Sequence, residues 1–268
     1  MTNPEQTGSK RRLAAVVLAR IDYGEADLIV TFLTRELGLL KALARYGRRS
    51  LRRFGGGLLS PGVSAWYNFT LKPQATLAFV ENGEENLKSP RLPADPVRQS
   101  LAAFALELAR SFETPFNPAP ESFRLLVHHL GRLARCSSDE AARLMSLDFV
   151  AKYMELAGFG SAFSDCLICG AKTAGTATDW HWDPEAGGLY CPLCLKQAPL
   201  RPNCRLVSPA ILNHLQPQGK DTKLPLLTVN DLAEAELFFE KLAEHQLGRS
   251  LKAMKAARQF FDKTSGRP

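Results

Sequence analysis

Short apolar runs separated by turn residues fill the first 80 residues of the chain. Five such runs, rich in Val, Ile, Leu and aromatic residues, predict β-strands at 13–21, 26–33, 39–46, 62–71 and 74–80. The run at 39–46 also fits a helix, because Leu, Ala, Lys and Arg favour helices. Five strands with one longer, Gly-rich connection after the third predict a small closed barrel of the OB-fold type over residues 13–82.

The segments on either side of these runs follow different patterns. Residues 1–12 are polar and basic without periodicity, which predicts a flexible basic arm. Three prolines within residues 89–96 predict a linker. After the linker, the helical period predicts a helix that begins at 97 and a second helix at 121–134. A third helix is expected to begin with a capping box at 137–140 and to end before 158. A short helix that begins at 208 and two more helices, near 231–247 and 249–262, are expected to follow. We therefore expect an α+β multidomain protein with a helical domain formed by 95–165 and 205–268.

Four of the six cysteines form two Cys-x-x-Cys pairs, separated by 21 residues. Two residues between cysteines allow a tight turn to direct both thiolates at one ion, and four Cys ligands leave no open coordination position. The pattern predicts one structural Zn²⁺ per chain, held by a module over residues 166–204. The expected ligands are Cys166, Cys169, Cys191 and Cys194.

A zinc-enzyme alternative depends on His181, which precedes the second cysteine pair. Zinc deaminases use His-x-Glu with a later Pro-Cys-x-x-Cys, whereas here Asp183 replaces the glutamate and Tyr190 replaces the proline. That alternative also leaves the first cysteine pair without a role, so we expect His181 to lie in a loop. The chain has no phosphate-binding loop and no nucleophile elbow. The sequence therefore predicts a protein that is not an enzyme.

The basic excess of the chain is confined to its first third. The chain has 34 Lys and Arg against 27 Asp and Glu, and residues 1–80 carry 12 of the basic and 5 of the acidic side chains. This asymmetry predicts a polyanionic partner. No apolar run approaches the roughly 18 residues of a membrane span, and sparse cysteines are typical of a reducing compartment. We expect a cytoplasmic protein without a membrane partner.

Six basic residues without an intervening acid lie between positions 41 and 53, and they are the predicted nucleic-acid contact: Lys41, Arg45, Arg48, Arg49, Arg52 and Arg53. Arg pairs with phosphates through a planar fork, although a charge run is also typical of a solvated face. Bases stack on aromatic residues, which lie nearby at Tyr23, Tyr46, Phe54, Trp66, Tyr67 and Phe69. A small barrel also needs aromatic residues for its core. A further basic patch within 249–268 fits DNA, an acidic peptide or a helix C-terminus equally.

Several sequence blocks together resemble a known family. These are AVVL at 15–18, DYGEAD at 22–27, TFLTRELG at 31–38, the Arg-rich loop, and LGRSLK at 247–252. With the two cysteine pairs after a helical stretch, they are similar to the bacterial recombination mediator family RecO over nearly the whole chain.

The resemblance implies an N-terminal OB-fold, a helical domain with a zinc module, and DNA work without a chemical step. RecO proteins bind single- and double-stranded DNA, anneal complementary strands, and act with RecR to load RecA on strands coated by SSB, whose acidic C-terminal tail RecO contacts. The resemblance implies that the loop from Lys41 to Arg53 contacts DNA. It also implies that the protein is associated with the nucleoid. An RNA-binding OB/zinc protein of translation or RNA metabolism stays open as the alternative, with a zinc enzyme that modifies nucleic acid as the third possibility.

Overall fold

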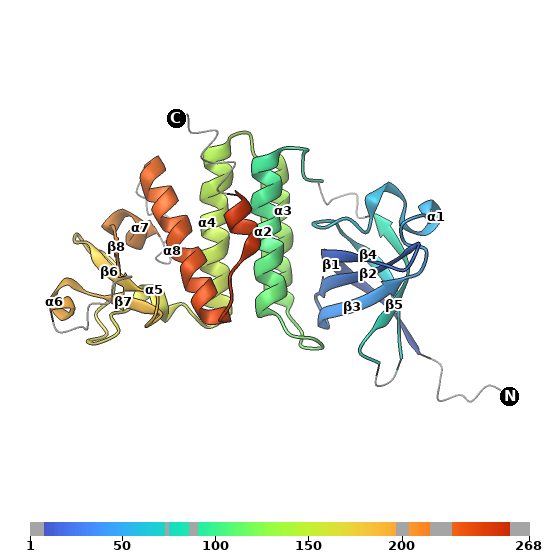
Figure 1. The fold of residues 1–268 in the computed structure, drawn as a ribbon, viewed down its shortest axis with the longest axis horizontal. Coiled ribbons are helices and arrows are strands. Elements are labelled where there is room, and N and C mark those ends of the chain that lie inside the picture. Colours follow the sequence, from blue (N-terminus) through green and yellow to red (C-terminus); the bar gives the residue numbers. More distant parts are fainter. Residues whose placement is uncertain (1–7, 73–74, 86–90, 197–203, 215–226, 258–268) are drawn as a thin grey trace. The chain divides into compact units, whose positions relative to one another are not determined.

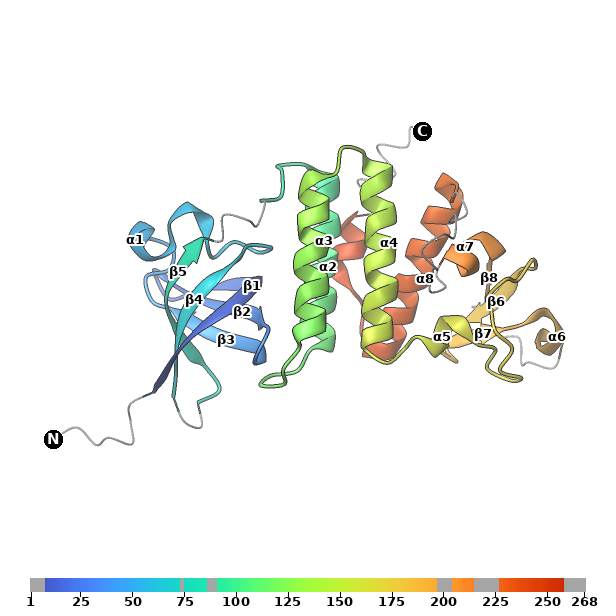
Figure 2. The same cartoon turned by 180° about the vertical axis from the view of Figure 1, so that it is seen from behind.

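The structure is a computed structural model that describes residues 8–72, 75–85, 91–196, 204–214 and 227–257. The described chain forms two compact units. The described residues within Met1–Cys136, together with 256–257, make the first unit, and the described residues within Ser137–Lys255 make the second. Figures 1 and 2 show the chain from opposite sides.

Five strands of the first unit close into a barrel in the order β1-β2-β3-β5-β4. They are β1 Ser9–Tyr23, β2 Asp27–Thr34, β3 Gly38–Ala44, β4 Ser64–Leu71 and β5 Ala78–Glu85. All pairs are antiparallel except β3 with β5. The connection from β3 to β4 carries the short helix α1, Leu51–Phe54, and the single turn η2, Gly55–Gly57. This OB-like barrel confirms the predicted fold class.

The barrel core is built by strict alternation along the strands. On β3, Leu40, Ala42 and Ala44 are buried in the core while Lys41 points to solvent. This pattern of period two makes 39–46 a strand rather than a helix over most of its length. The ring of Phe32 lies 4.9 Å from that of Tyr67 and 5.1 Å from that of Phe69. Strands β2 and β4 therefore meet through aromatic contacts in the core.

Two strands depart from their predicted bounds. The expected arm at 1–12 is wrong for residues 9–12, which belong to β1 because Ser9–Arg12 pair with Leu71–Asn68 of β4. β5 runs to Glu85 instead of ending at residue 80, since its polar end pairs with β4 as far as Ala65. Backbone pairing in a sheet does not require apolar side chains, so the apolar pattern underestimates both strands.

Two helices accompany the barrel in the first unit: α2, Pro96–Phe112, and α3, Pro120–Arg135. The Asp95 side chain caps α2 by accepting a hydrogen bond from the Arg98 backbone N–H at 2.7 Å. The Leu39 backbone N–H donates to the Thr114 carbonyl at 3.1 Å, which ties the connection between the helices to β3. A Cβ at Gly38 would lie 2.1 Å from the Asn117 carbonyl oxygen, so this close approach requires glycine. The expected helical domain at 95–165 is therefore divided, and its first two helices belong with the barrel.

The second unit combines helices with a small sheet. Its elements are α4 Asp139–Leu156, α5 Ser161–Ser164, β6 Trp180–Asp183, β7 Gly188–Tyr190, α6 Pro192–Leu195, β8 Arg205–Val207, α7 Pro209–His214 and α8 Val229–Leu247. Figure 1 shows α4 beside α8, and the three short strands pair in the order β7-β6-β8. Strands of three or four residues are too short to give a periodic signal, so the sequence did not predict this sheet.

Helix capping in this unit differs from the prediction in position. Ser138, not Ser137, caps α4 and accepts from the Ala141 backbone N–H at 3.2 Å, so the predicted box at 137–140 does not form. A complete capping box does form between Thr228 and Asp231 at the start of α8. Of the helix predicted at 249–262, residues 252–257 are helical and 258–262 lie outside the described residues. In the part of the chain that the structure describes, no helix combines the length and apolarity of a membrane span.

Candidate metal centre and nucleic-acid surface

The two cysteine pairs meet in the second unit. The sulfur atoms of Cys166, Cys169, Cys191 and Cys194 all lie within 4.8 Å of one another. The sulfurs of Cys169 and Cys191 are 3.8 Å apart. Zn–S bonds of about 2.3 Å in a tetrahedron place sulfurs about 3.8 Å apart. The arrangement therefore fits one tetrahedral, thiolate-bound metal ion.

Each pair is shaped by local backbone geometry. In the first turn, the Gly170 backbone N–H donates to the Cys166 carbonyl at 3.0 Å, and Gly170 adopts φ +68°, which favours glycine. The second pair opens α6, where the Cys191 sulfur accepts from the Cys194 backbone N–H at 3.4 Å. The Cys191 backbone N–H donates to the Cys166 sulfur at 3.4 Å and so joins the two turns.

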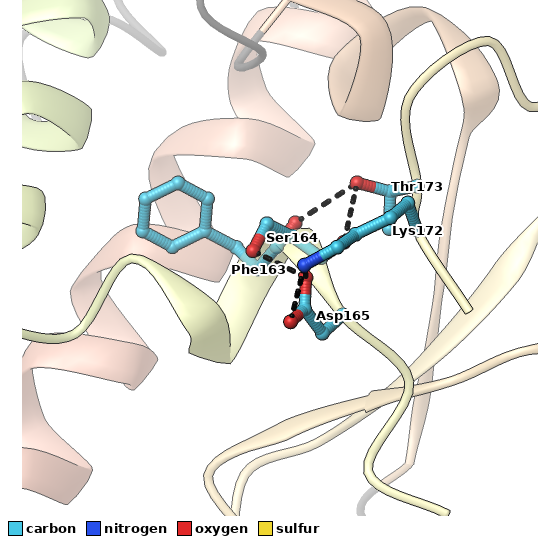
Figure 3. Close-up of polar contacts among 5 residues, drawn as sticks. All are labelled: Phe163, Ser164, Asp165, Lys172 and Thr173. Carbon is cyan, nitrogen blue, oxygen red and sulfur yellow. Dashed lines mark hydrogen bonds and ion pairs between the residues drawn. The ribbon is translucent and has the colours of Figure 1, made fainter. Parts of the chain in front are cut away.

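Polar contacts join the residues on either side of the Cys166–Cys169 pair (Figure 3). The Lys172 ammonium lies 2.7 Å from both carboxylate oxygens of Asp165, and Ser164 donates to the same carboxylate at 2.7 Å. These hydrogen bonds, with that from Lys172 first, lower the pKa of Asp165. The buried Thr173 hydroxyl bonds the carbonyls of Phe163 and Ser164 at 3.3 and 3.2 Å. The two chain segments that lead into and out of the Cys166 turn are thus held together.

Two of the four thiols, those of Cys166 and Cys194, have shifted pKa values. Burial raises the pKa of Cys166, but backbone N–H groups of Cys169, Cys191 and Ile168 hydrogen-bond its sulfur and lower the net pKa to about 6. Hydrogen bonding with Cys169 raises the pKa of Cys194 to about 12. The Cys166 thiol thus ionises readily, whereas the Cys194 thiol resists ionisation. A divalent cation removes this conflict, because it stabilises several thiolates together.

His181 lies on β6 rather than in the expected loop, opposite Tyr190 on β7 and Leu206 on β8. Its Nδ1 atom is buried and has no hydrogen-bond partner among the described residues. The ligand cluster in the described ranges consists of the four cysteines without this histidine. Four sulfurs complete a tetrahedral shell, so the geometry is that of a structural site.

The six basic residues predicted to contact nucleic acid lie together on the barrel. Lys41 projects from β3, Arg45, Arg48 and Arg49 lie on the turn that follows it, and Arg52 and Arg53 lie on α1. Arg48 is 3.6 Å from the Asp22 carboxylate. In the described ranges, no carboxylate lies within ion-pair distance of the other five. Their charge is therefore available to an external anion.

Arg53 differs from its neighbours because it builds the loop. Its side chain is half-buried and donates to the Ser50 hydroxyl at 3.0 Å and to the Arg45 carbonyl. Its guanidinium also lies 5.3 Å from the Phe54 ring centroid. We therefore expect replacement of Arg53 to disturb the shape of the loop as well as its charge.

The six aromatic residues divide between core and surface. Phe54, Tyr67 and Phe69 are buried, whereas Tyr23, Tyr46 and Trp66 are 54%, 65% and 41% exposed. The Tyr46 backbone N–H donates to the Asp27 carboxylate at 2.7 Å, which holds the basic turn against the β1–β2 hairpin. Tyr23 stands at the end of that hairpin, so two exposed rings accompany the basic residues.

Two residues that the sequence did not single out also belong to this surface. The Arg45 guanidinium and the Lys72 ammonium lie 5.0 and 5.5 Å from the ring centroid of Phe79. Phe79 falls within a predicted barrel strand, and the two cations come from other segments of the chain. Their contact with the Phe79 ring therefore depends on how the strands pair, which the sequence pattern does not show.

In the second unit, Lys255 of the 249–268 patch lies 3.9 Å from the Glu244 carboxylate, and the patch beyond residue 257 lies outside the described residues.

Comparisons with known proteins cover most of the chain. The family profile described as Recombination protein O N terminal matches residues 10–85, and Recombination protein O C terminal matches residues 93–255. The DNA repair protein RecO of Anaeromyxobacter sp. (strain Fw109-5) is 31% identical over 253 residues, which cover 94% of this chain and 95% of the relative. The DNA repair protein RecO of Synechococcus sp. (strain JA-3-3Ab) is 30% identical, over 86% of this chain and 75% of the relative.

Proposed function

This chain belongs to the RecO family of DNA repair proteins, and we propose that it binds DNA on the basic surface of its barrel and anneals complementary strands without a chemical step. Membership gives it a role in DNA repair and recombination. The observation that carries the proposal is the exposed group of cations that have no carboxylate partner among the described residues, of which Lys41, Arg49 and Arg52 are examples. Cations free of internal ion pairs are available to replace counterions along a phosphate backbone.

Annealing follows from the same electrostatics. Two single strands repel one another through their phosphates, and a surface that neutralises both holds them close enough to pair. We propose that the protein does this in the nucleoid on strands coated by SSB, contacts the acidic SSB tail, and acts with RecR to load RecA. Zn²⁺ at the four cysteines would tie their two turns together and supply no reactive position.

The first test replaces Arg48, Arg49 and Arg52 with Ala and leaves Arg53 in place, because Arg53 shapes the loop. Each lost phosphate contact removes about 0.7 from the salt slope for single strands, so we expect the slope to fall by about 2 and the affinity by about ten- to a hundredfold. Fluorescence anisotropy with a labelled oligonucleotide at several salt concentrations measures both. Unchanged affinity and slope in a folded variant would refute this surface.

The second test measures annealing of complementary oligonucleotides, bare and coated with SSB, with and without RecR. We expect the wild type to accelerate pairing and the triple variant to lose most of the acceleration, because the same cations hold both strands. Wild-type protein that binds DNA without accelerating pairing would contradict the annealing proposal.

The RNA-binding alternative is compatible with the same exposed surface. The exposed rings of Tyr23 and Tyr46 would stack RNA bases as readily as DNA bases. Competition between RNA and DNA oligonucleotides of equal sequence separates the two, because an RNA protein depends on the 2′-hydroxyl. We expect DNA to compete at least as well as RNA.

A further inference from the structure

A row of apolar side chains crosses the outer face of the barrel. Ile21 on β1 pairs with Ile29 on β2, which pairs with Leu43 on β3, which pairs with Phe79 on β5. None of the four belongs to the barrel core, and Ile21 is 61% exposed. Figure 1 shows these strands side by side. Four apolar residues facing outward on neighbouring strands have no role in closing the barrel.

Basic side chains surround the Phe79 end of this row. Arg45 and Lys72 lie over the Phe79 ring, and neither forms an ion pair in the part of the chain that the structure describes. Arg53 lines the same place and is held toward it by its hydrogen bond to the Arg45 carbonyl. Three cations thus gather around one aromatic ring, and each keeps donor groups for an anion.

A hollow of about 250 Å³ lies beside the ring. Its walls combine the ring and aliphatic side chains with the cations: Leu43, Arg45, Arg53, Thr70, Lys72, Phe79, Val80 and Glu81. The Glu81 carboxylate is the acid of this lining and accepts from Thr70 at 3.0 Å. The volume lies below the roughly 300–1,000 Å³ of pockets for drug-sized ligands, so it suits a group no larger than one nucleobase.

Trp66 provides an internal comparison on the same barrel. The Arg12 guanidinium lies 5.3 Å from its ring centroid, which repeats the arrangement of Arg45 over Phe79. Arg12, however, pairs with the Glu84 carboxylate at 2.6 Å. The cation at Trp66 is thus paired with a carboxylate, whereas no carboxylate of the described residues lies within ion-pair distance of Arg45 or Lys72. Charge therefore favours an anionic aromatic ligand at Phe79.

The geometry points to a single-strand subsite at Phe79. In this subsite one unstacked base enters the hollow and stacks on the Phe79 ring, while its phosphate contacts Arg45 and Lys72. This subsite rests on the proposed function and goes beyond it, because it distinguishes single from double strands. In a duplex the bases are stacked on one another and their faces are covered, so a duplex would contact the cations but leave the ring empty. The apolar row toward Ile21 provides further surface for neighbouring bases.

Phe79→Ala tests the subsite against Trp66→Ala as the matched control. Loss of one stacked base corresponds to about 1.4 kcal/mol, so Phe79→Ala is expected to weaken single-strand binding about tenfold. Binding of the matching duplex should stay within about twofold, and Trp66→Ala should leave both ligands within about twofold. Anisotropy with a labelled single strand and its duplex gives these values, and circular dichroism confirms the fold.

Each other outcome overturns a defined part of the inference. If Phe79→Ala binds single strands like the wild type while the Arg48, Arg49 and Arg52 variant is weakened, the subsite is wrong and the proposed function stands. If neither variant loses affinity, both are wrong. Equal loss for single strand and duplex refutes stacking. If Phe79→Ala does not fold, Phe79→Trp decides: its added fluorescence should fall when a single strand binds, and unchanged fluorescence refutes the subsite.

Discussion

Replacement of Cys191 by Ser is expected to prevent metal binding at the four cysteines and to unfold the segment that carries them. The Cys191 sulfur is 3.8 Å from that of Cys169, and the backbone of Cys191 hydrogen-bonds the Cys166 sulfur, so this residue connects both turns. Structural zinc contributes about 10–16 kcal/mol in zinc-finger peptides at neutral pH. The wild type should therefore contain about one zinc per chain and the variant almost none.

Limited proteolysis and metal analysis measure this effect. Cleavage of the variant should occur within residues 166–194, because a metal ion held by the four sulfurs would keep the turns there closed. Cys204→Ser is the matched control, since Cys204 lies in the same unit but outside the sulfur cluster. DNA binding of the variant should stay close to wild type, because the basic surface belongs to the other unit.

Chelation provides an independent arm of the same prediction. A strong chelator should make the wild type as sensitive to protease as Cys191→Ser, and added Zn²⁺ should restore resistance. Wild-type protein that carries no metal and resists protease in chelator would contradict a structural metal site.

The second large effect is expected at the buried ion pair between α4 and α8. Two nitrogen atoms of Arg143 each lie 2.8 Å from a carboxylate oxygen of Glu236, and the side chains are only 10% and 6% exposed. Arg143→Met leaves the Glu236 carboxylate buried without its main partner, which costs about 3–5 kcal/mol. Urea unfolding of the second unit should show this as a lower midpoint with an unchanged slope.

A double variant and an exposed ion pair test whether the unpaired, buried Glu236 carboxylate causes the loss of stability. Arg143→Met with Glu236→Met removes both charges, so most of the lost stability should return. Arg12→Met removes an exposed pair, 55% and 57% accessible, and should cost about 1 kcal/mol or less. A midpoint for Arg143→Met equal to that of the wild type would show that the buried pair does not stabilise the fold.

The sequence predicted those features that depend on residues close together in the chain. Two residues between cysteines suffice to aim both sulfurs, so all four members of the cluster were found from spacing. Short apolar runs bounded by turn residues predicted the five barrel strands, although the ends of β1 and β5 were misplaced because backbone pairing continues through polar residues. The short strands β6, β7 and β8 gave no signal, since three or four residues do not define a period.

The candidate DNA surface was predictable in composition but not in detail. The run from Lys41 to Arg53 is visible as charge along the chain. That Arg53 supports the loop depends on hydrogen bonds that a sequence does not show. Lys72 and Phe79 join Arg45 only because β3 pairs with β5, which lies 36 residues later in the register of Leu43 with Phe79.

The sequence by itself determined the family, the five barrel strands and the longer helices, the cysteine cluster and the basic segment, because each depends on residue type, period or short spacing. Tertiary structure alone decided which aromatic rings are exposed, which cations have no carboxylate partner within the described ranges, and that Arg143 meets Glu236, 93 residues away. The physical reason is that burial and ion pairing depend on which distant segments pack together. Closing the barrel buries Tyr67 and leaves its neighbour Trp66 in solvent, although the two are adjacent in the chain.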